Sequence, residues 1–526
     1  MGTLAPDSDA PAPPQTLSEA DLRRCAEVLE ALVADRGLLA DAPPDLRRAL
    51  LMAAGRVSRP GSREERKLAK AFRRGDRKRV RERDRAAVKG AEIRVAREAP
   101  VFVAPEARAL PPAAEAEARP DLLTPKDCYV CKRAYTKVHF FYDSMCPECA
   151  AFNYAKRFQS APLDGRAALV TGARVKIGFQ TALKLLRAGA SVVATTRFPH
   201  DAAERYAREP DFAAWRGRLQ IHGLDLRHSP SVELFARYLA QRLGRLDILI
   251  NNACQTVRRP PGFYADLIEL ESKKLPELPE PLRGPVGAHH ELKAALAQSA
   301  LEQAGAADPA GLAAWHGGAR GAAAGLLESA RLSLIPYAYE EAARREDLFP
   351  AGRTDADRQQ VDLRAQNSWR LRLAEVPTPE LLEVHLVNAV APFILCSRLK
   401  PLLLKDRSRS RYIVNVSAME GIFSRGTKTA RHPHTNMAKA ALNMLTCTSA
   451  REYERDGIYM TAVDTGWVTD EDPAAIAERK RAELDFQPPL DIVDGAARVL
   501  DPIFSGEATG RPYWGVFLKD YAPSAW

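Results

Sequence analysis

Four cysteines in two close pairs form the clearest chemical pattern in this 526-residue sequence. Cys128 and Cys131 make one C-x-x-C pair, Cys146 and Cys149 make a second, and 14 residues separate the two pairs. Two thiolates on each tight turn, brought together by an intervening hairpin over "AYTKVHFFYDS", would build the tetrahedral four-sulfur site that zinc prefers. Because four cysteines leave no open coordination position, we predict a structural zinc. Redox thiols or coincidental pairs are the alternatives.

Apolar strands alternate with amphipathic helices from Leu163 onward. The stretch "RAALVTGARVKIGFQTALKLLRAGASVVATTR" predicts a strand, a glycine-containing turn, a helix and a second strand, which is one βαβ unit. Further strands are expected at "RLQIHGLDL", "LDILINNA", "RYIVNVSA" and "IYMTAVDTG", and helices at "SVELFARYLAQRL", "TPELLEVHLVNAVAPFILCSRL" and around Lys439. The alternation predicts an α/β fold whose parallel sheet is covered by helices on both faces.

The sheet domain is interrupted by a Pro- and Ala-rich stretch at 255–376, which is too long for a simple connection and predicts an inserted subdomain or lid. Two amphipathic helices are expected near the start of the chain, one with Ser18 as N-cap and one after "APP" at 42–44. The expected divisions are a helical N-terminal region at 1–58, a basic helical or disordered arm at 59–98, a Pro/Ala linker at 99–124, the zinc module at 125–155, the first half of the sheet domain at 162–254, the insertion at 255–376 and the second half at 377–526.

The net charge of +10 belongs to one segment, because the stretch from Arg59 to Arg97 holds 16 basic and 6 acidic residues. This arm could grip phosphates of a nucleic acid non-specifically, or bind a protein, although Phe72 is its only aromatic residue for base stacking. The alternative is a solvated, partly disordered helix. The start "MGTLAPDSDA" lacks the apolar core of a signal peptide, and no uninterrupted apolar run reaches about 18 residues. We therefore expect a cytoplasmic, soluble protein.

Seven motifs in order resemble the short-chain dehydrogenase/reductase superfamily. They are T-G-x-x-x-x-I-G at 171–178, "GLDL" at 223–226, "NNA" at 251–253, Asn388, "VNVSA" at 414–418, Lys439 and "DTGWV" at 464–468. The resemblance covers about 162–254 and 377–526 and implies a Rossmann-like, doubly wound parallel sheet. The cysteine module is similar to zinc ribbons and rubredoxin-like knuckles over about 25 residues.

The resemblance implies a dinucleotide site. Gly172 and Gly178 would flank the turn that holds the cofactor pyrophosphate at a helix start. Lys176 replaces a glycine of the family, and its ammonium would either face a phosphate or point to solvent. Arg197 stands where members that use NADP place a cation for the 2′-phosphate, so NADP is favoured over NAD. The other expected cofactor contacts are Arg174, Ile177, Asp225 (for the adenine amino group), Leu226, Asn251, Asn252, Ala253, Lys439, Thr465 and Gly466.

The resemblance also implies a catalytic tetrad, of which two members are replaced. Family members use a tyrosine as proton donor, a lysine four residues later, a serine and an asparagine; this chain keeps Asn388 and Lys439 but has Thr435 and Ala418. A threonine hydroxyl is a much weaker acid than a phenol, whose pKa is about 10. His434 or His432, in the loop "TKTARHPHTN", could replace the tyrosine, or both could be ordinary polar loop residues.

Two functions follow from these patterns. The first is an NADP-dependent oxidoreductase that acts on a carbonyl, an alcohol or an activated alkene, with the insertion shaping the substrate pocket. The alternative is a catalytically silent NADP-binding scaffold whose zinc module and basic arm bind a protein or nucleic-acid partner. The resemblance further implies a homo-oligomer.

Overall fold

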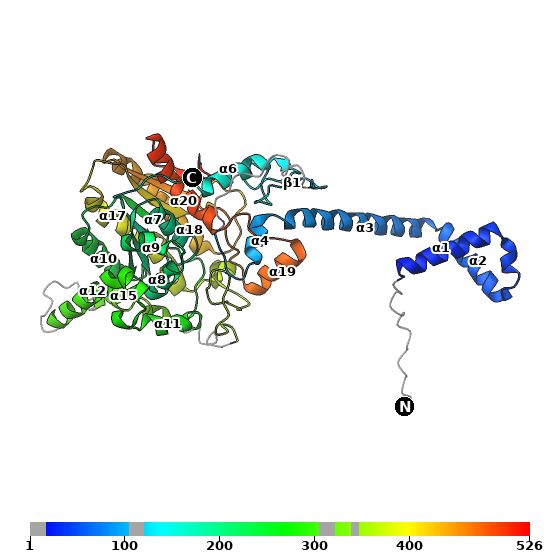
Figure 1. Ribbon diagram of the computed structural model, residues 1–526, viewed down its shortest axis with the longest axis horizontal. Helices are drawn as coiled ribbons and strands as arrows, with labels where there is room; N and C mark the ends of the chain where they lie inside the picture. The colour runs from blue at the N-terminus through cyan, green and yellow to red at the C-terminus, as the bar shows by residue number, and fades with distance from the viewer. Residues whose placement is uncertain (1–16, 105–119, 304–320, 338–346) are drawn as a thin grey trace, which may run out of the picture. The chain divides into compact units, whose positions relative to one another are not determined.

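The structure, a computed structural model, describes residues 17–104, 120–303, 321–337 and 347–526. The chain divides into two compact units, Met1–Glu82 and Arg83–Trp526. The first unit contains the helices α1 (Glu19–Ala34), η1 (Arg36–Leu39) and α2 (Pro44–Ser58), and α3 (Ser62–Lys89) begins in it (Figure 1).

Ser18 caps α1 as predicted. Its Oγ accepts a hydrogen bond from the Asp21 N–H at 3.2 Å, and the Asp21 carboxylate accepts one from the Ser18 N–H at 3.0 Å. This reciprocal pair satisfies two backbone donors that the first helical turn leaves without partners. The second helix begins at Pro44, directly after the "APP" stretch, as the sequence indicates.

An eight-stranded sheet forms the centre of the second unit, and it confirms the predicted α/β fold. Its order is β10-β9-β8-β7-β6-β3-β4-β5, and all neighbours are parallel except β9 and β10. The strands are β3 (Ala167–Thr171), β4 (Ser191–Thr196), β5 (Leu219–Gly223), β6 (Ile248–Asn251), β7 (Arg411–Ser417), β8 (Ile458–Asp464), β9 (Phe517–Lys519) and β10 (Ala522–Ser524). The strand order reverses between β3 and β6, and open α/β sheets bind ligands at such a switch point.

Helices cover both faces of this sheet, as Figure 1 shows. Helices α7 (Lys176–Arg187) and α20 (Ile492–Thr509) pack with Val170 and Val414 on one face. Helices α10 (Ser229–Arg242), α17 (Ala391–Leu403) and α18 (Pro433–Arg455) lie on the other face. Because both faces are covered, the central strands are apolar throughout, which is why the sequence shows continuous apolar runs there.

One helical run of the described residues, Thr378–Leu403, is long and apolar enough to cross a membrane by composition alone. It comprises α16 (Thr378–His385), a π-helical turn (Leu386–Val390) and α17. Half of it is buried inside the fold, where it packs against α10 and α18. In this structure the run serves as a core helix.

The cysteine module packs directly on the second half of the sheet domain. It contains β1 (Lys126–Asp127), β2 (Ala134–Tyr135) and α6 (Pro147–Arg157). The Arg157 guanidinium donates to both Asp491 carboxylate oxygens at 2.8 and 2.9 Å, and Tyr142 Oη donates to Asp494 Oδ1 at 2.5 Å. Since these groups are all buried, they fasten the module to α20.

Two expectations for this region need correction. The hairpin β1–β2 encloses the first cysteine pair, whereas we expected a hairpin between the pairs, and the second pair begins α6 instead. The arm expected at 59–98 also divides, because the second unit starts at Arg83 and includes α4 (Glu92–Glu98). Asp84 accepts the N–H groups of Leu123 and Thr124, which anchors this part of the chain; most of the expected linker, residues 105–119, lies outside the described residues.

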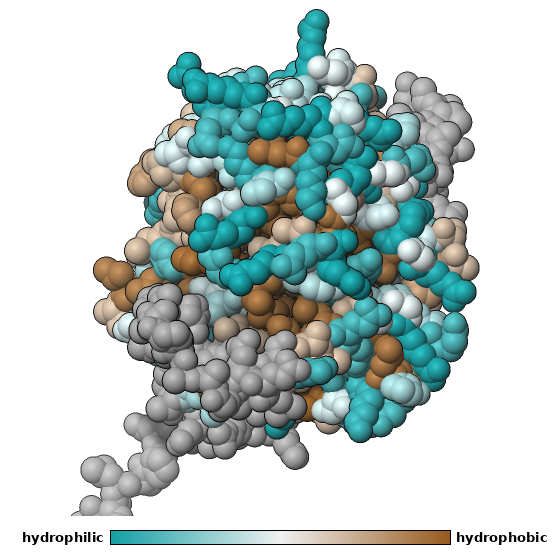
Figure 2. Space-filling view, turned by 90° about the vertical axis from the view of Figure 1, so that its left-hand side faces the viewer, coloured by the Kyte–Doolittle hydropathy of each residue, from teal (hydrophilic) through white to brown (hydrophobic). Residues whose placement is uncertain are grey.

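The insertion is mainly helical where the structure describes it. Its elements are η3 (Pro261–Tyr264), α11 (Ala265–Glu271), η4 (Leu275–Glu277), α12 (Glu280–Gln303), α15 (Ala324–Leu327), η5 (Arg331–Leu334), η7 (Ser368–Arg370) and η8 (Leu373–Glu375). Helix α12 packs along the edge strand β5 and against α8 (Pro199–Ala207), so the insertion covers one edge of the sheet. Figure 2 shows mainly hydrophilic side chains on this side of the unit, with apolar ones visible in patches between them.

Candidate functional site

A cavity of about 1270 Å³ lies at the carboxyl ends of the parallel strands. Its wall includes Gly172 after β3, Arg197 after β4, Asn252 after β6 and Ala418 after β7. The insertion and the cysteine module also contribute side chains to the wall. The predicted cofactor and substrate regions therefore belong to one continuous space.

At two glycines in the first turn of the βαβ unit, neighbouring atoms leave no room for a side chain. Gly172 has a φ of 68°, and a Cβ there would lie 2.8 Å from Ala253 Cα. A Cβ on Gly178 would lie 2.2 Å from the Gly172 carbonyl oxygen and 2.3 Å from Asn252 Nδ2. This close packing holds the start of α7 at the end of β3, where its free N–H groups suit a pyrophosphate.

Lys176 lines the cavity in a left-handed conformation, with a φ of 53°. That conformation explains why the family favours glycine at this position. The Lys176 ammonium lies 3.7 Å from Glu471 Oε1. Burial opposes the charged form, but Glu471 and Asp357 outweigh it and raise the pKa of Lys176. Lys176 thus lines the cavity with its ammonium beside Glu471, which disagrees with the solvent-facing alternative. Its contact with a cofactor phosphate stays a prediction.

Arg197 differs from its cationic neighbours in the groups that it contacts. Its guanidinium donates to Ser333 Oγ at 3.0 Å and to Tyr264 Oη at 2.7 Å, and both partners come from the insertion. By contrast, Arg174 pairs with Asp201 at 2.7 Å. Arg197 thus lines the cavity with two hydroxyls as hydrogen-bond partners, and its charge also acts on Asp225. A guanidinium in this place fits the 2′-phosphate of NADP.

Asp225, the expected partner of the adenine amino group, is held by a neighbouring guanidinium. Arg227 Nη2 lies 2.6 Å from Asp225 Oδ2, and Arg227 also pairs with Glu383 at 2.7 Å. Burial raises the pKa of Asp225, but Arg227 outweighs this effect and lowers it below the usual value. Its contact with adenine stays a prediction. The other expected cofactor contacts that line the cavity are Ile177, Leu226, Ala253, Thr465 and Gly466, whereas Asn251 is buried beneath it and donates to Asn415.

Lys439 and Asn388 are fixed by backbone groups. Lys439 lines the cavity and its ammonium donates to the Val416 carbonyl oxygen at 2.7 Å. Asn388 is fully buried in the π-helical turn, where its Oδ1 accepts the Gln255 N–H at 2.8 Å and its Nδ2 donates to the Gln255 carbonyl at 3.2 Å. Such π turns recur at functional sites.

Known proteins are similar to this chain in sequence. The short chain dehydrogenase family profile matches residues 166–267. A protein of Acanthamoeba polyphaga mimivirus, named only as uncharacterized protein R665, is 32% identical over 405 residues, which cover 75% of this chain and 74% of that protein. The profile match places residues 166–267 in the short-chain dehydrogenase/reductase family.

Two other known proteins are also similar to this chain. Mouse retinol dehydrogenase 13 is 36% identical over 111 residues, and the match spans 33% of that protein's length. The solved structure of an NADPH-bound carbonyl reductase from chicken fatty liver has a TM-score of 0.39 and 18% sequence identity, covering 69% of this chain and 100% of that chain.

The short-chain dehydrogenase tyrosine position is the main departure of this member. Among the described residues, neither Thr435 nor His434 lines the cavity, and both are buried. His434 Nε2 lies 3.7 Å from Glu380 Oε1 on α16. The structure therefore separates the two candidate histidines, and the expected role of His434 beside the substrate is wrong in this geometry.

His432 does line the cavity. Its ring stacks on Trp369 of the insertion, with ring centroids 3.9 Å apart and an angle of 7° between the planes. His432 Nδ1 lies 3.0 Å from Asn436 Oδ1, and burial lowers the pKa of the imidazole. It is therefore a neutral histidine near pH 7.

Two cavity residues were missed by the sequence analysis. Tyr129, between the first two cysteines, accepts the Trp467 N–H at 2.9 Å, and a Cβ on Gly466 would lie 3.1 Å from the Tyr129 hydroxyl. Asp464 ends β8, and burial together with Asp520 raises its pKa to about 6. Only the neighbouring motifs, C-x-x-C and "DTG", could have drawn attention to them.

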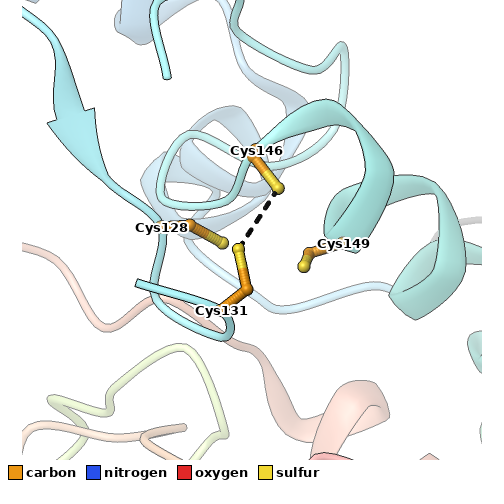
Figure 3. A group of neighbouring side chains, drawn as sticks. All are labelled: Cys128, Cys131, Cys146 and Cys149. Carbon is orange, nitrogen blue, oxygen red and sulfur yellow. Dashed lines mark hydrogen bonds between the residues drawn. The ribbon is translucent and has the colours of Figure 1, made fainter. Parts of the chain in front are cut away.

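The four cysteines meet as predicted. Their sulfur atoms all lie within 4.8 Å of one another, and the side chains point to a common centre (Figure 3). Cys131 Sγ and Cys146 Sγ are 3.7 Å apart. A tetrahedral zinc with Zn–S bonds of about 2.3 Å would hold its sulfurs about 3.8 Å apart, so this donor set fits zinc.

Proposed function

We propose that this chain is an NADP-dependent oxidoreductase that transfers a hydride to or from a carbonyl, an alcohol or an activated alkene. The observation that carries the proposal is one continuous cavity that joins the glycine turn, Arg197 and Lys439. When bound, NADPH supplies the hydride. In this chain Lys439 would hold the nicotinamide ribose, and Arg197 would hold the 2′-phosphate.

The charge of the cavity supports an anionic ligand. Fifteen basic and eight acidic side chains line it, which favours a cofactor with several phosphate charges. Trp369 and Phe263 of the insertion add aromatic surface. This combination suits a substrate with a flat or apolar body, and the insertion would determine which one fits.

The first experiment is a fluorescence titration of zinc-loaded protein with NADPH and NADH, followed by a panel of aldehydes, ketones, quinones and enones. Tight NADPH binding with consumption on any compound supports the oxidoreductase. Tight binding without consumption across the panel favours the silent scaffold, and no binding of either nucleotide overturns both.

The variant Arg197→Ala tests the choice of cofactor. Loss of one charge-assisted contact to the 2′-phosphate should weaken NADPH binding about 10- to 100-fold and leave NADH binding within about 2-fold. Equal effects on the two nucleotides would contradict the assignment of Arg197.

A second role, binding of a polyanion such as nucleic acid, is favoured by one observation in the first unit. Ten basic and four acidic residues lie between Arg63 and Glu82, and the basic side chains are exposed. We propose that this segment binds phosphate backbones in a salt-dependent manner. A variant lacking residues 1–82 should lose nucleic-acid binding at low salt while it keeps NADPH binding; unchanged nucleic-acid binding would refute this role.

A further inference from the structure

The reduction of a carbonyl needs a proton as well as a hydride, and this member lacks the tyrosine that supplies it elsewhere in the family. The inference that follows rests on the proposed oxidoreductase function. Since Thr435 and His434 do not line the cavity, the donor must come from another group on its wall.

Asp464 lies between the Ala418 position and the Thr465–Gly466 turn, two parts of the expected reaction site. It ends β8, where its backbone is in register with Ser417, next to the position vacated by the family's serine at Ala418. Its Oδ1 accepts the Met419 N–H at 3.3 Å, which holds the carboxyl beside the residue that follows Ala418. On its other side it directly precedes Thr465 and Gly466, and all three residues line the cavity.

The surroundings of the Asp464 carboxyl raise its pKa above the value that an aspartate has in water. Asp464 is only 5% exposed, and burial disfavours its charged form. Two other carboxylates, Asp520 and Glu420, act in the same direction, whereas Arg498 of α20 and Lys519 of β9 oppose them. Tyr129 of the cysteine module interacts with the same carboxylate and stays protonated.

His432 fits the role of donor less well. As a neutral imidazole, it satisfies its contact with Asn436 Oδ1 by donating from Nδ1, which leaves Nε2 as an acceptor. Burial disfavours the protonated form of the His432 imidazole, whereas burial favours the protonated form of the Asp464 carboxyl. Its stacking on Trp369 indicates instead that it shapes the wall on the insertion side.

We propose that Asp464 is the proton donor of this enzyme. The carbonyl carbon gains a hydride from the reduced nicotinamide, and the former C=O π electrons take the Asp464 carboxyl proton to form the alcohol O–H. Asp464 would be left as a carboxylate, and it would take up a proton from the solvent before the next cycle. In the oxidation direction the carboxylate accepts the alcohol proton.

The test compares Asp464→Asn, Asp464→Glu and the matched control Glu271→Gln. Asparagine keeps the size and the acceptor for the Met419 N–H but has no acidic proton. The Glu271 side chain is only 4% exposed and its carboxyl also has a raised pKa, but it lies outside the cavity wall. We expect Asp464→Asn to lower kcat for carbonyl reduction by about 100-fold or more, with the Kd for NADPH within about 2-fold.

The pH profile gives a second readout. A donor must be protonated, so wild-type kcat should fall about tenfold per pH unit above the pKa of about 6. Asp464→Glu should restore part of the rate with a displaced profile, and Glu271→Gln should leave the profile unchanged.

A third readout needs no cofactor. Because the folded state binds the Asp464 proton more tightly than the unfolded state, wild-type stability falls as pH rises from about 4 through about 6. The melting temperature of Asp464→Asn should therefore rise relative to wild type over that interval and match it near pH 4.

The outcomes separate the two proposals. A wild-type protein that consumes NADPH, together with an Asp464→Asn variant that is equally active with the same pH profile, overturns the Asp464 assignment alone. A wild-type protein that binds NADPH but consumes it with none of the aldehydes, ketones, quinones and enones favours the silent scaffold over the oxidoreductase and overturns this assignment with it. Loss of rate in Asp464→Asn with intact NADPH binding supports both.

Discussion

Lys439 is present although the tyrosine that usually precedes it by four residues is replaced by Thr435. Its ammonium is held by the Val416 carbonyl, so its position does not depend on a tyrosine four residues earlier. A lysine fixed in this way can bind a ribose hydroxyl whether or not Thr435 takes part in chemistry. The same independence makes its contribution to binding measurable.

Lys439→Met should weaken NADPH binding by about 10- to 100-fold, because a hydrogen bond from a charged group contributes about 1.5–3 kcal/mol. Lys405→Met is the matched control: the Lys405 ammonium also donates to backbone carbonyls, those of Ala240 and Leu243, but lies outside the cavity wall. Fluorescence titration checks both variants. Equal affinities in the two would show that Lys439 is only structural.

Glu271 carries a pH dependence of stability. Burial raises its pKa to about 8, against the opposing N–H groups of Asp201 and His200. The folded state thus holds a proton that the unfolded chain releases above about pH 4.5, so stability falls as pH rises from about 5 to 8, by at most about 1.4 kcal/mol per pH unit. Denaturant unfolding of Glu271→Gln should show a dependence smaller by one proton across this interval, and an unchanged slope would contradict the shift.

At the scale of elements, the cysteine module is part of the cavity wall. The hairpin that carries Cys128 and Cys131 brings Tyr129 to the Trp467 backbone, and α6 is fastened to α20 by the Arg157 ion pairs. A structural zinc would therefore stabilise the site as well as the module.

Cys131→Ser should lose the bound zinc, lower the melting temperature and weaken NADPH binding, since Trp467 and Gly466 lose their support. Tyr129→Phe should keep one zinc per chain and change NADPH binding alone. Metal analysis, thermal unfolding and nucleotide titration distinguish the variants. Full NADPH affinity in zinc-free Cys131→Ser would show that nucleotide binding does not depend on the cysteine module.

At the scale of the whole molecule, we propose that a second copy of the chain covers α16, α17 and α18. Leu382, Phe393, Met437 and Met444 of these helices are 50% or more exposed. Phe393→Glu should shift the protein from dimer to monomer in sedimentation analysis, with the exposed Arg242→Glu on α10 as control. A wild-type monomer at micromolar concentration would refute the proposal.

The sequence by itself determined six of the eight strands of the sheet and the four-cysteine cluster, because these depend on local periodicity and spacing. The strands β9 and β10, of three residues each, were too short to predict, and the order of the strands in the sheet was not predicted. The Ser18 cap and the start of α2 at Pro44 follow from the same kind of local signal. It also placed Gly172, Gly178 and Lys439 at the cavity through motifs of the family.

Only the tertiary structure decided which groups face the reacting space. His432 and His434 are two residues apart, yet the turn into α18 points one to the cavity and the other to α16. Tyr129 and Trp467 are 338 positions apart and meet because the module packs on α20. The raised pKa of Asp464 likewise depends on its burial and on Asp520, which follows the neighbouring strand β9. Contacts between residues so far apart in the sequence depend on tertiary packing, so local sequence patterns do not predict them.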